Sequence, residues 1–233
     1  MNLMHTDPIE AYFELMEIRP DLFTKAPLLP AICTDKTKMN EFIKNTEKKL
    51  GVVYNNYPFF YVIADLCVKG TPEQPFYYSY ARVVYPDAQS NGTVTIPYWN
   101  GKFGLISTYR HAPRQNTGWE FPRGFFDERA ITPLFNAHKE LWEETGIQPN
   151  EILKTTYLGD VRADAGLSSG KVQLYLAEIT LPKSISLEAD EGIAKYHWFS
   201  LKEMMQMIEN EQIVDGFTLS AFMKVIAKQI ISR

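Results

Sequence analysis

One predicted helix, residues 132–146, constrains this chain more than any other segment of the sequence. A Thr-Pro pair opens the helix and a glycine ends it, and both are common boundary signals. Within it, Glu140, Glu143 and Glu144 occupy positions i, i+3 and i+4, so their carboxylates project from one face. Like charges at this spacing destabilise an isolated helix by roughly 0.2–0.5 kcal/mol per pair. A bound divalent cation would reverse that penalty, and a solvated acidic surface is the alternative.

Segments rich in β-branched and aromatic residues lie on both sides of this helix, separated by turn-forming residues. They cover residues 59–68, 76–85, 92–99, 103–110, 155–161, 171–179 and 195–201. Further helices are expected at 8–18, 36–50, 201–210 and 217–230. The pattern predicts an α+β fold, an α/β/α sandwich in which helices flank a mixed β-sheet. We expect an N-terminal helical extension over residues 1–50 and the main domain over residues 51–233.

The composition excludes several classes of function. The chain has 233 residues, of which 45% are hydrophobic and 22% are charged, as in ordinary globular proteins. The formal charge of −4 gives no global attraction to nucleic acid or to an anionic membrane, so neither is expected as a partner. No apolar run approaches the roughly 20 residues of a membrane-spanning helix. Two cysteines without metal-ligand spacing fit a reducing compartment, and we expect a soluble cytoplasmic protein.

The sequence KELWEETGI, residues 139–147, resembles the second half of the Nudix signature, G-x5-E-x7-R-E-U-x-E-E-x-G-U, where U is a bulky aliphatic residue. Its acidic, aliphatic and glycine positions match without a gap. The first half departs from the pattern. Lys139 stands where the family has arginine, and the first glutamate of the signature falls at Ala130 or Ile131. The resemblance implies a Nudix-type sandwich that follows the N-terminal extension.

A second resemblance lies just before the helix. WEFPRG, residues 119–124, is similar to the E-x-P-x-G segment of the ADP-ribose and ADP-sugar pyrophosphatase branch of the family. Arg110, Arg114 and Arg123 cluster in the same region of a slightly acidic chain, and arginine forks match phosphate oxygens. The resemblance implies substrate-binding roles for these arginines and for Glu120. For Arg114, a solvated loop is the alternative.

The Nudix resemblance also implies a metal centre. Glu140, Glu143 and Glu144 would bind Mg²⁺, or Mn²⁺ in its place, and the main-chain carbonyl of Arg123 or Gly124 would add an oxygen ligand. The three glutamates and Lys139 are therefore the expected catalytic residues of the helix. Lys139 replaces an arginine that orients a catalytic carboxylate, and an ammonium reproduces that hydrogen-bonding fork poorly.

An acidic loop, residues 188–191, precedes the last predicted strand. In ADP-ribose pyrophosphatases, a loop at this place supplies a glutamate that positions or deprotonates the attacking water. Glu191 is the first candidate for this catalytic role, with Glu188 and Asp190 as alternatives. A solvated acidic turn is the plain explanation for all three residues.

Together these likenesses imply metal-dependent hydrolysis of a nucleoside diphosphate linked to another moiety, with ADP-ribose or a related nucleotide sugar as the expected substrate. The products would be a nucleoside monophosphate and a second phosphorylated compound. Two alternatives stay open, a non-catalytic nucleotide sensor and a Nudix hydrolase acting on dinucleotides or capped RNA. The resembled branch is usually homodimeric, so a homodimer is expected.

Overall fold

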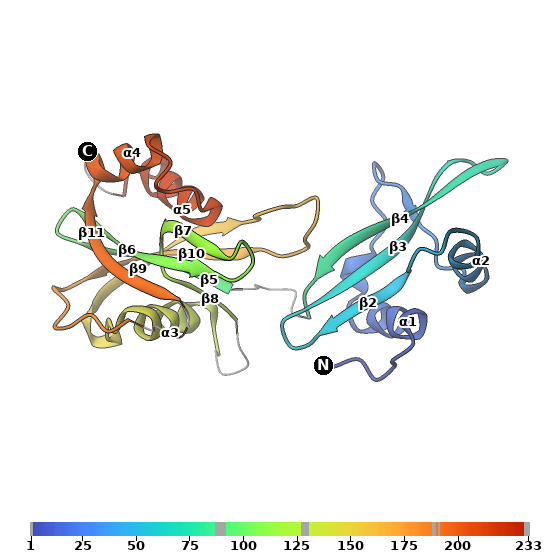
Figure 1. Cartoon of the computed structure of the whole chain (residues 1–233), viewed down its shortest axis with the longest axis horizontal. Coiled ribbons are helices and arrows are strands. Elements are labelled where there is room, and N and C mark those ends of the chain that lie inside the picture. Colours follow the sequence, from blue (N-terminus) through green and yellow to red (C-terminus); the bar gives the residue numbers. More distant parts are fainter. Residues whose placement is uncertain (1, 87–91, 127–130, 188–189, 191, 231–233) are drawn as a thin grey trace. The chain divides into compact units, whose positions relative to one another are not determined.

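The computed structural model describes residues 2–86, 92–126, 131–187, 190 and 192–230 (Figure 1). The chain divides into two compact units. One unit contains residues 1–89 together with residues 164–170, and the other contains residues 90–163 and 171–233. Each unit has its own β-sheet and its own buried core.

The N-terminal unit combines two helices with a four-stranded sheet. Its elements are α1 (Pro8–Ile18), the 3₁₀ turn η1 (Pro20–Phe23), β1 (Ala31–Ile32), α2 (Lys36–Thr46), β2 (Gly51–Asn56), β3 (Phe60–Thr71) and β4 (Gln74–Val84). Strands β1, β2 and β4 all pair antiparallel with β3. Asp7 and Asp35 cap the two helices by accepting hydrogen bonds from first-turn amides. Helix α2 ends before the predicted residue 50 because Glu47 adopts a left-handed conformation with φ of +58°.

Strands β2–β4 fold with the N-terminal helices, whereas the sequence prediction placed them in the second domain. Their buried side chains, among them Ile63, Leu66 and Val84, share one hydrophobic cluster with Tyr12 of α1 and Met39 of α2. The two compact units therefore divide after residue 89, where the prediction divided the chain after residue 50. The helical extension is part of a larger unit that contains its own sheet.

Residues 164–170 also belong to this N-terminal unit, although they lie between β9 and β10 in the sequence. The main-chain N–H of Val83 donates to the carbonyl of Leu167 at 2.8 Å, and Ser169 N–H donates back to the Val83 carbonyl at 2.9 Å. The hydroxyl of Tyr80 donates to the carbonyl of Gly166. A short segment of the second half of the chain thus pairs with strand β4.

The second unit is built on a seven-stranded mixed sheet. Its strands are β5 (Gly92–Trp99), β6 (Lys102–Arg110), β7 (Gln115–Glu120), β8 (Arg123–Phe125), β9 (Ile152–Val161), β10 (Val172–Ile179) and β11 (Ile193–Ser200). The main order is β11-β6-β5-β10-β9, while β7 pairs with β6 and β8 pairs with β5. Strands β5 and β10 run parallel, and the other pairs run antiparallel. The predicted mixed sheet is confirmed.

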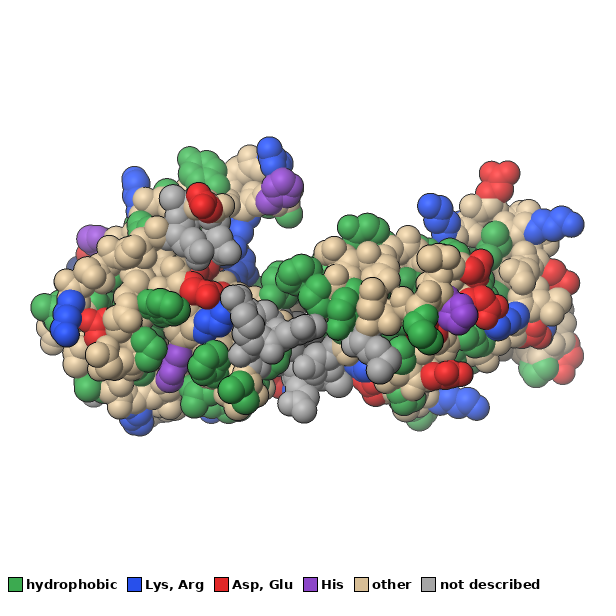
Figure 2. Space-filling model, turned by 90° about the horizontal axis from the view of Figure 1, so that it is seen from below, with side chains coloured by type: hydrophobic (Ala, Val, Ile, Leu, Met, Phe, Trp, Pro, Cys, Tyr) green, Lys and Arg blue, Asp and Glu red, His purple; other side chains and the backbone are tan. Residues whose placement is uncertain are grey.

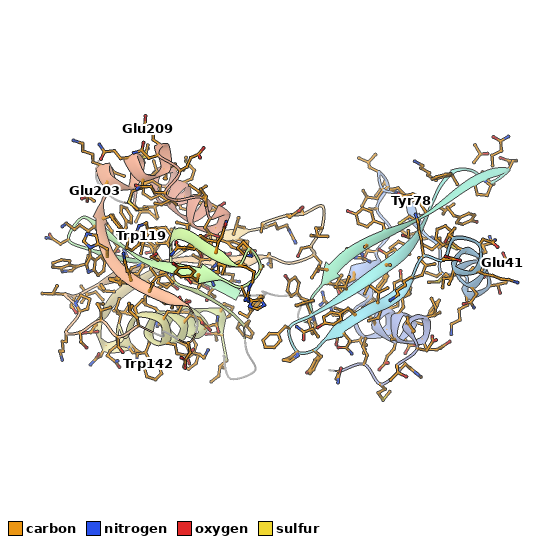
Figure 3. The ribbon with its side chains drawn as sticks, in the orientation of Figure 1. Glu41, Tyr78, Trp119, Trp142, Glu203 and Glu209 are labelled. Atoms are coloured by element: carbon orange, nitrogen blue, oxygen red, sulfur yellow. The ribbon has the colours of Figure 1, made fainter. Side chains whose placement is uncertain are left out.

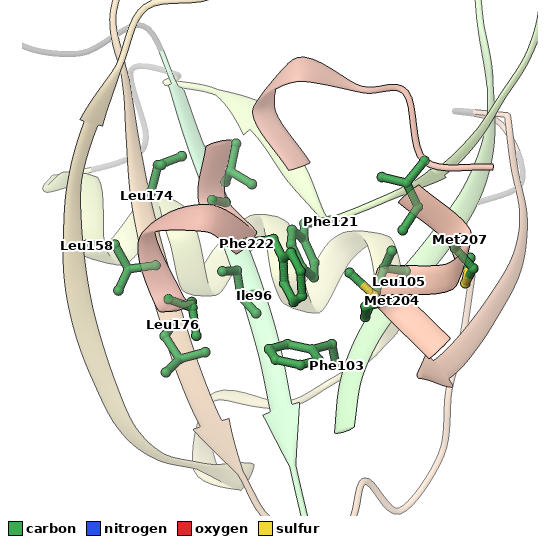
Figure 4. Packing of buried hydrophobic residues seen from close by; sticks show 14 residues of the cluster. Ile96, Phe103, Leu105, Phe121, Leu158, Leu174, Leu176, Met204, Met207 and Phe222 are labelled. Carbon is green, nitrogen blue, oxygen red and sulfur yellow. The ribbon is translucent and has the colours of Figure 1, made fainter. Parts of the chain in front are cut away.

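Helices cover both faces of this sheet (Figure 1). On one face, α3 (Pro133–Thr145) contributes Leu141 to a cluster with Ala177 and Ile179, and the 3₁₀ turn η2 (Pro149–Glu151) follows it. On the other face, α4 (Leu201–Glu209) and α5 (Gly216–Ala227) pack over a larger cluster that includes Phe103 and Phe222 (Figure 4). The α+β fold class and the α/β/α sandwich predicted from the sequence are confirmed.

The surface is mixed in charge. On the face shown in Figure 2, basic and acidic side chains are interspersed instead of being separated by sign. Within the described part of the chain, no helix is long and apolar enough to cross a membrane.

Candidate active site

Helix α3 directs two of its three glutamates, Glu140 and Glu144, toward strand β8. Thr132 caps the start of the helix by accepting a main-chain hydrogen bond at 3.1 Å, and Gly146 ends it with φ of +79°. The side chains of Glu140 and Glu143 are 11% and 31% exposed, and Glu144 is buried. Trp142, on the same helix, points to solvent (Figure 3). The helix therefore buries two carboxylates and leaves a third at its edge.

Strand β8 contacts both buried carboxylates. The main-chain N–H of Arg123 donates to Glu144 Oε2 at 2.8 Å. The Glu140 carboxylate lies against Gly124, where an added Cβ atom would stand only 1.9 Å from Glu140 Oε2. Any side chain at this position would displace the carboxylate, so the close approach requires glycine. Strand β8 thus contacts Glu144 through the main-chain N–H of Arg123, and it contacts Glu140 at Gly124, where no side chain intervenes.

Lys139 pairs with two of the three glutamates. Its ammonium lies 3.0 Å from Glu140 Oε1 and 2.9 Å from Glu143 Oε2. The lysine side chain is only 11% exposed, so water screens these ion pairs weakly. Lys139 therefore offsets part of the repulsion among the glutamates, and it holds Glu143 beside Glu140.

The donor chemistry of this face suits a hard divalent cation, since carboxylate oxygens are the ligands that Mg²⁺ and Mn²⁺ prefer. One turn before Glu140, the buried Asn136 adds an Oδ1 atom that accepts no hydrogen bond within the described residues. Among these residues, no three Asp, Glu, His or Cys side chains converge into a complete metal site. Glu140 and Glu144 are the two carboxylates that lie against the main chain of strand β8.

Two of the predicted substrate-binding arginines share one buried carboxylate. Arg110 donates to Glu120 Oε2 through Nη2 at 2.7 Å and through Nε at 3.1 Å. Arg123 Nη2 lies 3.0 Å from the same oxygen. Burial opposes the charge of Arg110, but the hydrogen bond and the charge of Glu120 outweigh it, so the pKa of Arg110 is raised. The structure brings Arg110, Glu120 and Arg123 together in ion pairs within the protein, while their predicted binding of substrate stays a prediction.

A fourth member of this network, Asp215, was missed by the sequence analysis. Its Oδ1 lies 3.0 Å from Arg123 Nη1, and its Oδ2 accepts hydrogen bonds from the main-chain N–H and the hydroxyl of Thr218, both at 2.8 Å. An aspartate before a predicted helix indicates an N-cap, which Asp215 is. The sequence carries no signal for its second partner, because Arg123 lies in a distant strand.

A family model for the NUDIX domain matches residues 91–217, which contain helix α3, strand β8 and the network from Arg110 to Asp215. The chain belongs to the NUDIX family. The match covers most of the second unit and begins just after the division between the two units. The family expected from the sequence of residues 139–147 is therefore confirmed.

Two similar proteins add detail. The ADP-ribose pyrophosphatase of Mycobacterium tuberculosis (strain ATCC 25618 / H37Rv) is 28% identical over 132 residues, which are 55% of this chain and 60% of that protein. The chain thus matches about three fifths of that relative's length. A crystal structure of an ADP compounds hydrolase has a TM-score of 0.61 at 17% identity, covering 88% of this chain and 96% of that chain. At this identity, the likeness concerns the fold alone.

The remaining predicted substrate-binding residue of the NUDIX domain, Arg114, lies in the turn between β6 and β7. It is exposed, has a positive φ of +56°, and its Nη1 lies 2.8 Å from Nδ1 of the equally exposed His111. The structure thus places Arg114 in a surface turn, outside the network formed by Arg110, Glu120 and Arg123.

The predicted water-orienting residue, Glu191, lies outside the described residues, as does Glu188. Asp190 is described and is exposed. Of the two positions at which the first glutamate of the Nudix signature would fall, Ala130 is outside the described residues and Ile131 is 86% exposed.

A groove of about 680 Å³ lies on the α4 side of the NUDIX sheet. Its wall includes Trp119, His197 and Phe199, and the rings of Trp119 and Phe199 meet edge to face with centroids 4.9 Å apart. Trp119 and Glu120 are successive residues of β7, so their side chains point to opposite faces of the sheet. None of the α3 glutamates lines this groove, so we do not assign it to the reaction centre.

Proposed function

We propose that this chain is a metal-dependent pyrophosphohydrolase that cleaves a nucleoside diphosphate linked to a second moiety, with ADP-ribose or a related nucleotide sugar as substrate. The observation that carries the proposal is the pair Glu140 and Glu144, two carboxylates that β8 holds on one face of α3 within the NUDIX match. The substrate class is supported by the names of the two similar proteins. The products would be a nucleoside monophosphate and the phosphorylated second moiety.

Each residue of α3 has a defined part in this proposal. A bound Mg²⁺ or Mn²⁺ ion would neutralise charge on the diphosphate and lower the pKa of water. Glu140 and Glu144 would hold the ion, with Glu143 and the carbonyl of Arg123 as further oxygen donors. Lys139 would keep Glu140 and Glu143 oriented, since its ammonium already contacts both carboxylates.

The arginines would serve different purposes. Arg123 uses both of its terminal nitrogens for ion pairs with Glu120 and Asp215, so it would fix β8 beside the glutamates. Arg110 pairs through one edge of its guanidinium and keeps 28% of its side chain exposed, so it is better suited to contact a phosphate. Glu191 is the proposed acceptor for a proton of the attacking water.

A second candidate function is a NUDIX domain that binds a nucleotide without hydrolysing it. This non-catalytic function is favoured by Lys139, which stands where the family has arginine. Its ammonium forms ion pairs with both Glu140 and Glu143. Calorimetry with ADP-ribose, combined with product analysis, separates the two candidates. Tight binding without formation of AMP, in either Mg²⁺ or Mn²⁺, would support the sensor. Dinucleotides and capped RNA belong in the same substrate panel, with products identified by mass.

A homodimer is part of the proposal and is supported by the N-terminal unit. Its strands β2–β4 expose large rings, with Tyr54 53%, Phe76 56% and Tyr80 41% exposed. Exposed apolar surface of this kind is typical of an interface. Light scattering during size-exclusion chromatography gives the mass directly. We also propose a cytoplasmic location, because Cys33 and Cys67 are both free thiols, as in reducing compartments.

The decisive experiment measures AMP release from ADP-ribose by the wild type and by Glu144→Gln in Mg²⁺ and in Mn²⁺. The substitution removes a buried negative charge at nearly constant volume, and we expect turnover to fall by about 10²–10³-fold. Glu209→Gln, at an exposed position of α4, is the matched control and should keep wild-type turnover. If Glu144→Gln releases AMP as fast as the wild type, the proposed mechanism is wrong.

A further inference from the structure

The connection between α4 and α5 runs along the segment that leads into strand β8. Gly118 forms an isolated antiparallel bridge with Ile213, and the Trp119 N–H donates to the carbonyl of Gln212 at 3.3 Å. Farther along, the Phe121 N–H donates to the hydroxyl of the fully buried Thr218 at 3.0 Å. The α4–α5 connection and the first turn of α5 are therefore attached at several points to the residues that precede strand β8.

Asp215 makes the last of these attachments, with its two oxygens divided between two tasks. Oδ2 caps α5, and Oδ1 forms the ion pair with Arg123. The other aspartate caps of this chain differ. Asp7 and Asp35 each accept both of their first-turn amides through one oxygen, Oδ1, at 2.9–3.0 Å and 2.9–3.2 Å respectively. The arrangement at Asp215 thus does more than cap a helix.

We infer that Asp215 is a positioning residue for the proposed metal centre, acting through Arg123; this rests on the proposed function. The Arg123 guanidinium is held between Asp215 on one side and Glu120 on the other, and it stacks on the Phe217 ring at 4.9 Å. These contacts, together with the pairing of Arg123 with Val94 of β5, restrain the main chain of Arg123. Its N–H is the donor that holds the Glu144 carboxylate at 2.8 Å.

The charges of this network are balanced within the protein. Two guanidinium groups, of Arg110 and Arg123, face two carboxylates, of Glu120 and Asp215. The Asp215 side chain is 11% exposed and that of Glu120 is 1% exposed, so water screens these pairs weakly. Removing the charge of Asp215 would leave Arg123 with one anionic partner in place of two, and its side chain would turn toward Glu120. The Arg123 N–H would then lose its alignment with Glu144.

The test compares the wild type with Asp215→Asn. Asparagine caps helices as well as aspartate does, so the cap should survive with its single oxygen turned to Thr218, while an amide nitrogen faces Arg123. Groups that orient metal ligands are worth about 10–100-fold in metal affinity or activity. We therefore expect Mn²⁺ affinity, by electron paramagnetic resonance titration, and kcat each to fall by about tenfold or more. KM should stay within about threefold, since no contact with substrate is removed.

Two further measurements distinguish positioning from a general loss of structure. The amide proton of Arg123 should move upfield in the NMR spectrum of metal-free Asp215→Asn, because its hydrogen bond to Glu144 weakens. In a double-mutant cycle, Arg123→Lys combined with Asp215→Asn should lose no more activity than the worse single variant. Asp35→Asn, a cap in the N-terminal unit, is the matched control and should leave every readout unchanged.

The outcomes are distinct. Mn²⁺ affinity and kcat within twofold of the wild type for Asp215→Asn, or losses that multiply in the double variant, overturn the inference. If Asp215→Asn does not fold, Asp215→Ser keeps a capping oxygen without the arm toward Arg123, and the same readouts apply to it. If the wild type itself hydrolyses no nucleotide, the proposed function fails, while the Mn²⁺ titration and the Arg123 amide shift still test Asp215.

Discussion

Both units of this protein bury carboxylates, but Asp65 of the N-terminal unit and the glutamates of α3 are held by different partners. In the N-terminal unit, Asp65 is 2% exposed and accepts hydrogen bonds from the Tyr12 hydroxyl and from Arg82 Nε, the latter at 2.6 Å. The Arg82 guanidinium also lies over the Phe23 ring at 5.3 Å. Burial and the nearby Asp65 charge together raise the pKa of Tyr12 far above its usual value, so its hydroxyl stays a donor. One carboxylate here has one guanidinium as its counter-charge.

On α3 the carboxylates are held differently. Glu140 and Glu143 share the ammonium of Lys139, and Glu144 accepts a hydrogen bond from the main-chain N–H of Arg123. The carboxylate group thus serves a different purpose in each unit. A carboxylate with its own counter-charge links helix to sheet in the N-terminal unit. Carboxylates that share one ammonium on α3 are, in the proposed function, the oxygen donors for a divalent ion.

The largest expected effect would break the first half of this comparison. Asp65→Asn removes the counter-charge of Arg82, and breaking a buried ion pair in this way costs about 3–5 kcal/mol of stability. Hydrogen exchange of the β3 amides in urea should report this loss. Tryptophan fluorescence should not, because all four tryptophans belong to the second unit, and it serves as the internal control. Equal losses by both probes would mean that the two units unfold as one.

The next effect concerns Gly124. Gly124→Ala places a methyl group where the Glu140 carboxylate lies, and the flexible end of Glu140 must move away. A displacement of about 1 Å at a catalytic group can cost about 10²-fold in turnover, so activity should fall far more than stability. Gly216→Ala is the control, because an added Cβ there meets nothing within 4 Å. A variant with full turnover would show that the position of Glu140 is unimportant.

A smaller effect, in the opposite direction, is expected for Lys139→Arg. A guanidinium offers separate nitrogens to Glu140 and Glu143, where the ammonium must reach both with one. One better hydrogen bond is worth about 0.7 kcal/mol, so kcat should rise by about threefold with KM unchanged. Initial rates of AMP release measure the change. A fall in kcat would mean that the packing of the lysine side chain at this position matters more than the separate nitrogens of a guanidinium.

The smallest expected effect is the contribution of His138, on helix α3, to the pH dependence of stability. Burial lowers the pKa of His138, whose Nε2 lies 2.8 Å from the Thr155 hydroxyl on β9. The unfolded chain therefore binds a proton more readily, and the folding free energy contributed by neutral His138 is lost as pH falls below the unfolded value of about 6.5. Tryptophan-detected stability should decrease from pH 7 to pH 5, and less so in His138→Gln. An identical pH dependence in both proteins would contradict this assignment.

Local patterns predicted local features of this structure well. The spacing of Glu140, Glu143 and Glu144 placed them on one helical face, and the structure confirms the expected helix starts at residues 8 and 36. These predictions rest on neighbours within about one helical turn, where main-chain geometry decides the outcome.

The misplaced features depend on partners far away in the sequence. Strands β2–β4 have the β-branched and aromatic composition of strands in either unit, and only burial against Tyr12 and Met39 assigns them to the first. Arg123 was expected to face a phosphate, yet its guanidinium pairs with Glu120 and Asp215. Composition and spacing report which groups are present, but long-range packing decides which of them meet.

The pairing of residues 164–170 with strand β4 has a consequence for how this protein can be divided. The N-terminal unit is not one uninterrupted stretch of chain, since seven of its residues are encoded between two strands of the NUDIX sheet. Removing the first 89 residues would separate residues 164–170 from the strand they pair with, and grafting those 89 residues onto another enzyme would leave β4 paired with β3 alone among the described strands. The two units are therefore expected to be inherited and exchanged together. A change in the length of the segment between β9 and β10 should first alter the N-terminal unit, to which residues 164–170 belong.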